Sequence, residues 1–278
     1  MTSLLWRGLT LATGETADYR ITSIEGWEEL PPSRYDKTPR ARAHGAHPSP
    51  VWADERIVTV QGFTPVSDQR DTLLAALRSG LGGFTDVEYP LTITDAGRTL
   101  TASAQLLRAA PIRRPGEWGV GRFGWAAQWR CPDPLRYGQP QSLSTGLPTS
   151  GGGLEYPLTY PLDYGDPGDP GRVTLTNPGT ADAPILLAVT GPLDAGFEVS
   201  AGGRRLTYPT EVPAGQVITL DTATGHVLAE GTADRRGELT YAEWFSVPAG
   251  GSLALQFTSL GGYDPAARLD ATWAEAHW

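Results

Sequence analysis

Residues 123–131 read Phe-Gly-Trp-Ala-Ala-Gln-Trp-Arg-Cys, a stretch in which an apolar side chain stands at every second position. The apolar positions are Phe123, Trp125, Ala127, Trp129 and Cys131. Successive side chains of a strand point to opposite faces, so this period of two predicts a β-strand with one buried face. The tryptophans Trp125 and Trp129 on that face indicate core or interface packing.

Three further segments of the first half follow the same alternation. They are Ile57–Val60, Leu91–Thr94 and Leu100–Leu106. We predict a strand for each, although the alanines of the last segment would also suit a short helix.

One segment of the first half predicts a helix. Ser67 can cap its start, Leu73, Leu74 and Leu77 would form an apolar stripe, and Gly80 can close it.

The second half of the chain reads as strand and turn. Apolar and polar residues alternate over 252–258, which predicts a half-buried strand. Asn177-Pro178-Gly179-Thr180 has the composition of a type II turn, and we expect it to link strands at Val173–Thr176 and Ile185–Val189. Strands at this spacing predict an antiparallel β-sandwich of roughly 8 to 10 strands.

Glycine and proline are concentrated between residues 139 and 171, where regular structure is not expected. Charge also changes there: residues 1–140 contain 16 cations and 15 anions, whereas the remainder contains 6 and 16. We therefore predict an N-terminal domain over 1–137, a Gly/Pro-rich junction over 138–170 and a C-terminal domain over 171–278. The predicted fold class is mainly β, with one short helix in the first domain.

Composition excludes several classes of protein. The chain has 278 residues and a single cysteine, so it can form neither an intrachain disulfide nor a cysteine-clustered zinc site. Its net charge of −9 argues against a generally basic surface for nucleic acid. The apolar run 183–189 is too short to cross a bilayer, and Arg7 interrupts the candidate signal sequence. We expect a soluble protein without an export signal.

Constellations with known chemistry are weak in this sequence. His44 and His47 could share a metal only if the chain turns, and no third ligand is evident. Asp163, Asp166 and Asp169 have the oxygen ligands that calcium prefers, but their spacing does not match a calcium-binding loop. Gly80, Gly82 and Gly83 resemble a phosphate-binding loop, but they follow the predicted helix instead of preceding one. Carboxylates that could be imagined as a glycosidase acid pair are Glu25, Glu28, Glu29, Asp54 and Glu55. The sequence predicts no catalytic residues, no metal and no cofactor.

A basic segment bounded by prolines runs from Pro31 to Pro50. Its cations are Arg34, Lys37, Arg40 and Arg42. Two interpretations stay open: a solvated flexible arm, or an arm that becomes ordered by docking against an acidic surface of another subunit or a partner protein.

Several of the nine tryptophans have no periodic context. Trp27, Trp52 and Trp244 could each be exposed. Trp273 alternates in phase with its apolar neighbours and is expected in the core, which leaves Trp244 and Trp278 as the candidate exposed rings of the second half.

Read in order, the punctuation of the whole chain resembles the siphophage distal tail protein family. The first half contributes Gly26-Trp-Glu-Glu-Leu-Pro-Pro-Ser-Arg34, His44-Gly-Ala-His47, Arg56-Ile-Val-Thr-Val-Gln-Gly62 and Cys131-Pro-Asp-Pro-Leu-Arg-Tyr137. The second half contributes Val173-Thr-Leu-Thr-Asn-Pro-Gly-Thr180, Pro184 to Gly191, Phe197-Glu-Val199, Val212-Pro-Ala-Gly-Gln216, Ile218-Thr-Leu-Asp-Thr222 and Phe245-Ser-Val-Pro-Ala-Gly-Gly-Ser-Leu253.

This resemblance implies an N-terminal belt domain that assembles into a hexameric ring, followed by a galectin-like sandwich. The ring would join the tail tube to the tail tip in a virion whose proteins are made in the host cytoplasm. Implied partners are further copies of the chain, the tail tube protein, a tail-associated hub or lysin protein and receptor-binding proteins, with DNA only in transit and no membrane. The resemblance implies no enzymatic activity and no cofactor.

Two alternative functions stay open at this point. The first is a carbohydrate-binding module of a cell-surface or phage adhesion protein, and the second is a glycosidase. Because sugar binders and hydrolases of that kind are usually secreted, the missing export signal disfavours both.

Overall fold

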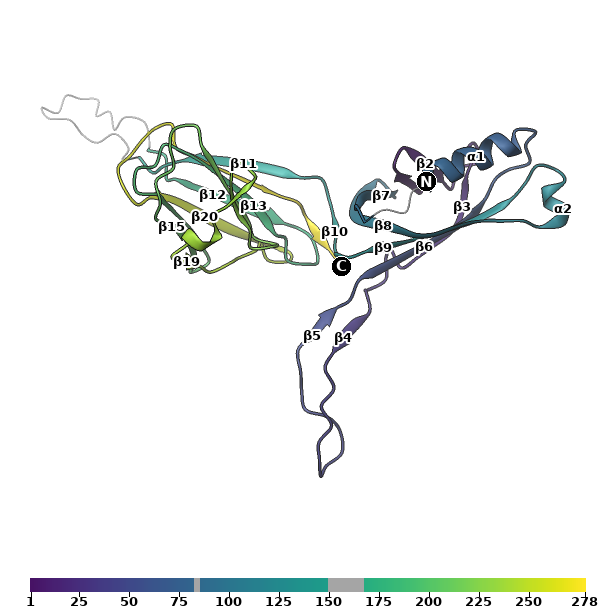
Figure 1. Ribbon diagram of the computed structural model, residues 1–278, viewed down its shortest axis with the longest axis horizontal. Helices are drawn as coiled ribbons and strands as arrows, with labels where there is room; N and C mark the ends of the chain where they lie inside the picture. Colours follow the sequence, from purple (N-terminus) through teal and green to yellow (C-terminus); the bar gives the residue numbers. More distant parts are fainter. Residues whose placement is uncertain (83–85, 150–167) are drawn as a thin grey trace, which may run out of the picture. The chain divides into compact units, whose positions relative to one another are not determined.

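The computed structural model of the chain describes residues 1–82, 86–149 and 168–278. These divide into two compact units, Met1–Gly138 together with Trp278, and Gln139–His277. Both consist mainly of β-strands (Figure 1), which confirms the predicted mainly β fold class.

Strands make up most of the regular secondary structure of the first unit, which also has two helices. Its strands are β1 (Ser3–Trp6), β2 (Leu9–Ala12), β3 (Arg20–Glu25), β4 (Ser33–Tyr35), β5 (Val51–Ala53), β6 (Arg56–Phe63), β7 (Tyr89–Asp95), β8 (Arg98–Ile112), β9 (Gly124–Cys131) and β10 (Arg136–Tyr137). Its helices are α1 (Arg70–Gly80) and the short α2 (Pro115–Trp118). Neither these nor any other helix of the described residues has the length and apolar character that crossing a membrane requires.

The main sheet of the first unit closes on itself through β8. Its order is β10-β8-β7-β1-β2-β3-β6-β9, and β9 also pairs with β8. This is possible because β8 is long: its first half pairs with β7, and its second half pairs with β9. The β2–β3 pair is parallel, and the other pairs are antiparallel.

The core of this unit is built on the face of β9 that the sequence predicts. Trp125 and Trp129 are fully buried, and the ring of Trp6 meets Trp129 edge to face at a centroid distance of 5.8 Å. Leu74 and Leu77 of α1 pack into the same core. The alternation of apolar residues therefore identified both the strand and its inner face.

Two local predictions for α1 need correction, whereas the strand predicted for residues 100–106 is confirmed. The helix begins at Arg70, not after Ser67, whose hydroxyl accepts the backbone N–H of Gln69 at 3.0 Å as part of a turn before the helix. Gly80 is the last helical residue, and Leu81 ends the helix in a right-handed conformation, so no glycine cap forms. Residues 100–106 lie within strand β8, and the helical alternative is wrong.

The second unit consists of two antiparallel sheets. One sheet has the order β11-β21-β13-β16-β17-β18 and the other the order β12-β20-β14-β15-β19. The strands of this unit are β11 (Gln141–Gly146), β12 (Arg172–Asn177), β13 (Ile185–Thr190), β14 (Phe197–Ala201), β15 (Arg204–Tyr208), β16 (Val217–Asp221), β17 (Val227–Ala229), β18 (Ala233–Asp234), β19 (Tyr241–Ala242), β20 (Gly251–Ser259), β21 (Arg268–Trp273) and β22 (Ala276–His277). A short 3-10 helix covers Arg236–Glu238.

Each of the two sheets buries one face. Leu187 and Leu220 are fully buried on one sheet, and Val199 and Phe257 on the other. The indole N–H of Trp273 in β21 donates to the Thr176 carbonyl in β12 at 2.8 Å, which joins the two sheets. The second unit is thus the predicted antiparallel β-sandwich.

One prediction about the junction is wrong. Gln141–Gly146 falls within the predicted junction, yet it forms β11 and pairs along its whole length with β21. The strands predicted on either side of Asn177–Thr180 are present as β12 and β13, and they pair with other strands and not with each other: β12 with β20, and β13 with β16 and β21. The rest of the predicted junction includes residues 150–167, which lie outside the described residues.

The buried Asn177 side chain explains the conformation after β12. Its amide nitrogen donates to the Ala181 carbonyl at 2.8 Å, and its oxygen accepts the N–H groups of Gly179 and Ala276 at 3.0 and 3.2 Å. These bonds hold a crossing from one sheet to the other: the bond from Gly179 closes an Asx turn, and the others make Asn177 a buried hydrogen-bonding centre.

We predict that Trp129→Ala lowers the free energy of unfolding of the first unit by about 3–5 kcal/mol, because it leaves a large cavity beside Trp6. Denaturant unfolding followed by tryptophan fluorescence measures this. The control is Trp52→Ala, which removes an indole with 64% exposure and should change stability by less than about 0.5 kcal/mol. Equal effects of the two variants would contradict the assignment of Trp129 to the core.

Candidate functional site

The basic segment of the first unit forms a long β-hairpin, which we call the arm (residues 31–54). Strands β4 and β5 pair in it with Arg34 opposite Trp52, and they form a two-stranded sheet of their own. Further bonds continue the pairing towards the tip: the His47 N–H donates to the Thr38 carbonyl at 2.9 Å, and the Arg40 N–H donates to the Gly45 carbonyl at 3.2 Å. Figure 1 shows the two segments of the arm, which contain β4 and β5, running beside each other. The arm is therefore a paired hairpin where the sequence indicated only a basic loop.

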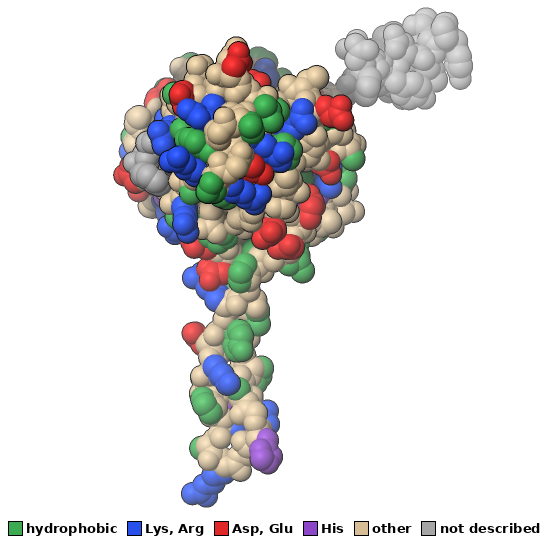
Figure 2. Space-filling view, turned by 90° about the vertical axis from the view of Figure 1, so that its right-hand side faces the viewer, with side chains coloured by type: hydrophobic (Ala, Val, Ile, Leu, Met, Phe, Trp, Pro, Cys, Tyr) green, Lys and Arg blue, Asp and Glu red, His purple; other side chains and the backbone are tan. Residues whose placement is uncertain are grey.

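The four candidate docking cations are all exposed on this hairpin. Arg34, Lys37, Arg40 and Arg42 lie in the stretch 32–45, in which every residue is exposed. Within the described residues none of the four forms an ion pair. Lysine and arginine side chains recur along the arm in Figure 2. Their charges are therefore available to an acidic partner.

The arm also exposes apolar side chains that the sequence analysis mostly missed. Tyr35 is 59% exposed, and Val51, directly opposite it in the ladder, is 63% exposed. Trp52 is exposed as well, in agreement with one of the expectations from sequence. Aromatic rings beside arginines are typical of the centres of protein interfaces. The occurrence of Tyr35 and Trp52 in the same segment as Arg34 is the signal by which the sequence could have indicated these exposed side chains.

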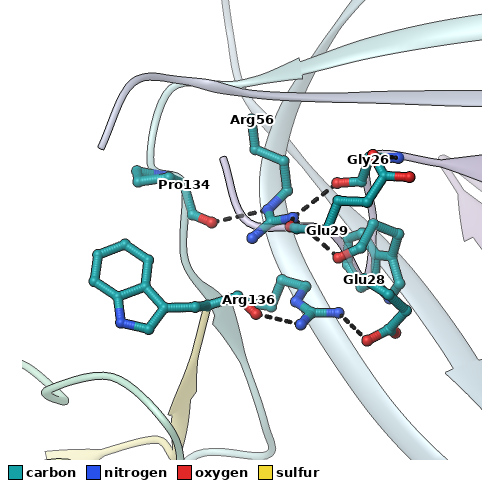
Figure 3. A network of polar contacts seen from close by, with 8 residues as sticks. Gly26, Glu28, Glu29, Arg56, Pro134 and Arg136 are labelled. Atoms are coloured by element: carbon teal, nitrogen blue, oxygen red, sulfur yellow. Dashed lines mark hydrogen bonds and ion pairs between the residues drawn. The ribbon is translucent and has the colours of Figure 1, made fainter. Parts of the chain in front are cut away.

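A buried arginine holds the base of the arm. Arg56 is 1% exposed and follows the arm directly. Its Nη1 donates to the backbone carbonyls of Gly26 and Glu29 at 2.7 Å each and of Trp27 at 3.0 Å, and its Nε donates to the Pro134 carbonyl at 2.9 Å (Figure 3). Since residues 26–29 precede the arm, one side chain ties together both ends of the hairpin.

A second arginine lies beside the first. Arg136 Nη1 is 2.9 Å from the Glu28 carboxylate, its guanidinium lies 5.4 Å from the Trp27 ring centroid, and its Nη2 donates to the Trp278 carbonyl (Figure 3). Burial, and next to it the positive charge of Arg136, holds the pKa of the Arg56 guanidinium below its usual range. A guanidinium titrates far above neutral pH, so Arg56 stays charged there. The carbonyl oxygens around it stabilise this charge.

Four of the five carboxylates considered as an acid pair have structural partners. Glu28 pairs with Arg136, the Glu29 carboxylate accepts the Gly26 N–H at 3.1 Å, and Glu55 lies 2.5 Å from Arg130. Asp54 caps the neighbouring Glu55 N–H at 2.9 Å, and Glu25 is exposed at the end of β3. These contacts orient the chain around the base of the arm.

The residues considered for metal binding are spread over the arm tip and the region before β12. His44 and His47 are both exposed. Among the described residues no group of three or more histidine, cysteine or acidic side chains is arranged to hold a metal ion. Asp163 and Asp166 lie outside the described residues, and Asp169 accepts the Gly171 N–H at 2.8 Å.

The glycines considered as a phosphate cradle follow α1. Gly80 ends the helix with its Cα facing the Leu9 side chain, and the position of a Cβ on Gly82 would lie 2.5 Å from the Arg78 carbonyl. These are close contacts at a helix C-terminus, the end at which anions are disfavoured. Gly83 lies outside the described residues.

Three other candidates are placed as follows. Trp27 is buried with 4% exposure under the Arg136 guanidinium, so its possible exposure is not realised. Trp244, the candidate exposed ring, is half-buried, and the Arg236 guanidinium lies 5.8 Å from its centroid. Cys131 is fully buried, and burial raises the pKa of its thiol to about 12.

Comparisons with known proteins give one informative likeness. A scan against protein-family models finds no match, and no curated protein is significantly similar in sequence. Among solved structures, the chain is similar to the SPP1 Dit (gp 19.1) protein, described as a paradigm of the hub adsorption apparatus in phages that infect Gram-positive bacteria. The TM-score is 0.67 at 14% identity, over 99% of both chains. Two structures of the activated phage P2 baseplate, with Ca and with Sr, match at a TM-score of 0.45 each and 10% and 11% identity, over 98% of this chain and 97% of theirs.

The likeness to SPP1 Dit defines a fold class, that of the phage distal tail hub proteins. At 14% identity it shows the fold and nothing finer. The resemblance of the sequence to the siphophage distal tail family is confirmed at this level. No residue of the arm is assigned a role by it.

We predict that Arg56→Met destabilises the first unit by about 3 kcal/mol or more, because it leaves four backbone carbonyls without their buried donor. The arm should also loosen at its base, so trypsin should cleave it faster at Arg40 and Arg42 under native conditions. Denaturant unfolding and limited proteolysis measure the two effects.

The control for Arg56→Met is Arg130→Met. It makes the same substitution at a half-exposed arginine that pairs with Glu55, and it should cost about 1 kcal/mol or less. If Arg56→Met cleaves and unfolds like Arg130→Met, Arg56 does not hold the arm.

Proposed function

We propose that this chain is a structural protein of a phage tail tip, a distal tail hub protein without catalytic activity. The observation that carries the proposal is the likeness to SPP1 Dit over 99% of both chains, since a match to one common β-sandwich would cover the second unit alone. Fold alone does not fix function, so the surfaces of this chain must support the same role.

In the proposed assembly, six copies form a ring through the N-terminal domain, and the ring joins the tail tube to the tail tip. Ring contacts are head to tail, so each copy must present two different, complementary surfaces. The arm supplies one of them, with exposed cations beside Tyr35, Val51 and Trp52. Because Arg56 fixes its base, little conformational entropy remains to be lost there on docking.

The proposed partners follow from this position in the virion. They are other copies of the chain, the tail tube protein, a tail-associated hub or lysin protein and, at the periphery, receptor-binding proteins. DNA would pass through the ring without being held, and the near balance of 16 cations and 15 anions in residues 1–140 suits a passage that does not retain phosphates.

Native mass spectrometry of the purified chain tests the ring directly. We expect a species of six times the 29.7 kDa chain mass. A strictly monomeric protein over the whole micromolar range would contradict the ring, and with it the proposed hub.

We predict that replacing Arg34, Lys37, Arg40 and Arg42 with serine slows assembly by about tenfold at low ionic strength, because complementary charge steers association. The difference from the original protein should shrink as salt rises. Light scattering after dilution from a dissociating condition measures the rate, and circular dichroism checks the fold.

A charge-preserving variant is the matched control for this experiment. With Arg34, Arg40 and Arg42 replaced by lysine, assembly should proceed at nearly the original rate, since steering depends on net charge. Assembly of the serine variant that is unchanged at every ionic strength would show that the arm does not dock through its charges.

A further inference from the structure

The second unit carries a groove of about 390 Å³ on the outer face of the sheet that contains β12, β20, β14 and β15. We call it the arginine groove. Its polar lining consists of Arg172, Ser200, Arg204, Arg205 and Gln256, and Ala254 with the Gly202-Gly203 turn forms a low floor.

Strand register arranges four of these side chains in one row across the sheet. Arg172 stands opposite Gln256, Gln256 opposite Ser200, and Ser200 opposite Arg205. Residues that are directly opposite in antiparallel strands share a face. The neighbouring positions Val199 and Leu206 are fully buried, so the row faces outward.

Charge sets this row apart from the rest of the second unit. Residues after 140 contain 6 cations and 16 anions, yet three of the cations line this one groove and no carboxylate lines it. Around Arg205, the Glu198 carboxylate lies 3.9 Å away and Glu243 accepts its backbone N–H at 3.1 Å. Arg172 donates to the Gln256 amide at 3.2 Å and Arg204 to the Trp244 carbonyl at 2.9 Å, so the charges of both are unneutralised by these contacts.

We propose that the arginine groove binds an extended acidic segment of a partner protein, with carboxylates placed four residues apart. Guanidinium groups recognise carboxylates by paired hydrogen bonds, which suits the two ends of the row. Gln256 and Ser200 between them can bond the peptide backbone. The groove thus reads both charge and an extended conformation.

The spacing of the row supports this segment length. Three strand spacings separate Arg172 from Arg205, which is about 14 Å. An extended peptide advances about 13 Å in four residues, and side chains at an even spacing point to the same side. Two carboxylates four residues apart can therefore reach both ends at once.

Other classes of ligand fit less well. Sugars need a free aromatic face, but the Tyr241 ring is covered by the Arg205 guanidinium at 3.5 Å and the Trp244 ring faces Arg236. Nucleic acid would be repelled by the net charge of −10 that residues after 140 carry, the difference between their 6 cations and 16 anions. This groove is on the second unit and does not involve the arm, so its test stands or falls apart from the test of the ring.

The experiment uses the full chain and a fluorescein-labelled peptide of nine residues, with glutamates at its third and seventh positions and threonine and glycine elsewhere. We expect saturable binding by fluorescence anisotropy at low ionic strength. Arg172→Gln combined with Arg205→Gln should weaken it about tenfold, since the exposed ion pairs at both ends of the row are lost.

Two controls test the specificity of the groove. Arg235→Gln combined with Arg268→Gln makes the same charge change at exposed arginines of this unit outside the groove, and it should alter binding less than about twofold. A peptide with glutamine in place of both glutamates should not bind, and one with the glutamates two residues apart should bind more weakly.

Three results would overturn the inference. They are the absence of saturable binding, an equal loss of binding in both double variants, and tighter binding of an oligohexuronate than of the peptide. The last result would assign the groove to acidic carbohydrate.

Discussion

The buried guanidinium of Arg56 is the contact on which the projecting part of the first unit depends. Four backbone carbonyls from two separate chain segments accept its hydrogen bonds, and Arg136 stands beside it. A guanidinium can serve so many acceptors because its donors lie in one rigid plane. The β3–β6 ladder joins the chain before and after the arm as far as Glu25, and Arg56 extends this link to residues 26–29, from which the arm starts.

The two units present different kinds of surface to a partner. The first presents a hairpin that buries almost none of its own residues, so its aromatic rings and charged groups are exposed and can contact a partner. The second keeps a regular sandwich and places side chains from four strands in one row on its surface. The proposed hub function would use both kinds of surface, a projecting hairpin and a groove.

The sequence predicted those features that depend on local periodicity. Phe123 to Cys131 alternate because β9 has one buried face, and this pattern identified both the strand and the core. The arm was not recognised as a hairpin because neither of its faces is buried, so pairing leaves no apolar alternation. The partner of β12 could not be predicted because strands of a sandwich pair with partners far along the chain, and β12 pairs with β20 about eighty residues later.

The candidate sites also differ in whether their residues are close together in the sequence or are brought together only by the fold. The cations of the arm are close together in the sequence and could be found by composition alone. The arginine groove draws on Arg172, Ser200 and Gln256, which only strand register brings together. Arg56 could not be singled out, since nothing in its local sequence indicates that four carbonyls converge on it.

The burial of Cys131 has a practical consequence for the arm. The chain has no other cysteine, and this thiol is sealed in the core with a pKa of about 12, so it stays protonated and out of reach of alkylating reagents near neutral pH. A cysteine introduced at Ala41 would then be the one thiol that reagents can modify in the folded protein. Cys131 would not react with the labelling reagent, so a spin label or photo-crosslinker attached at position 41 would report only on the arm and on the molecules that it contacts.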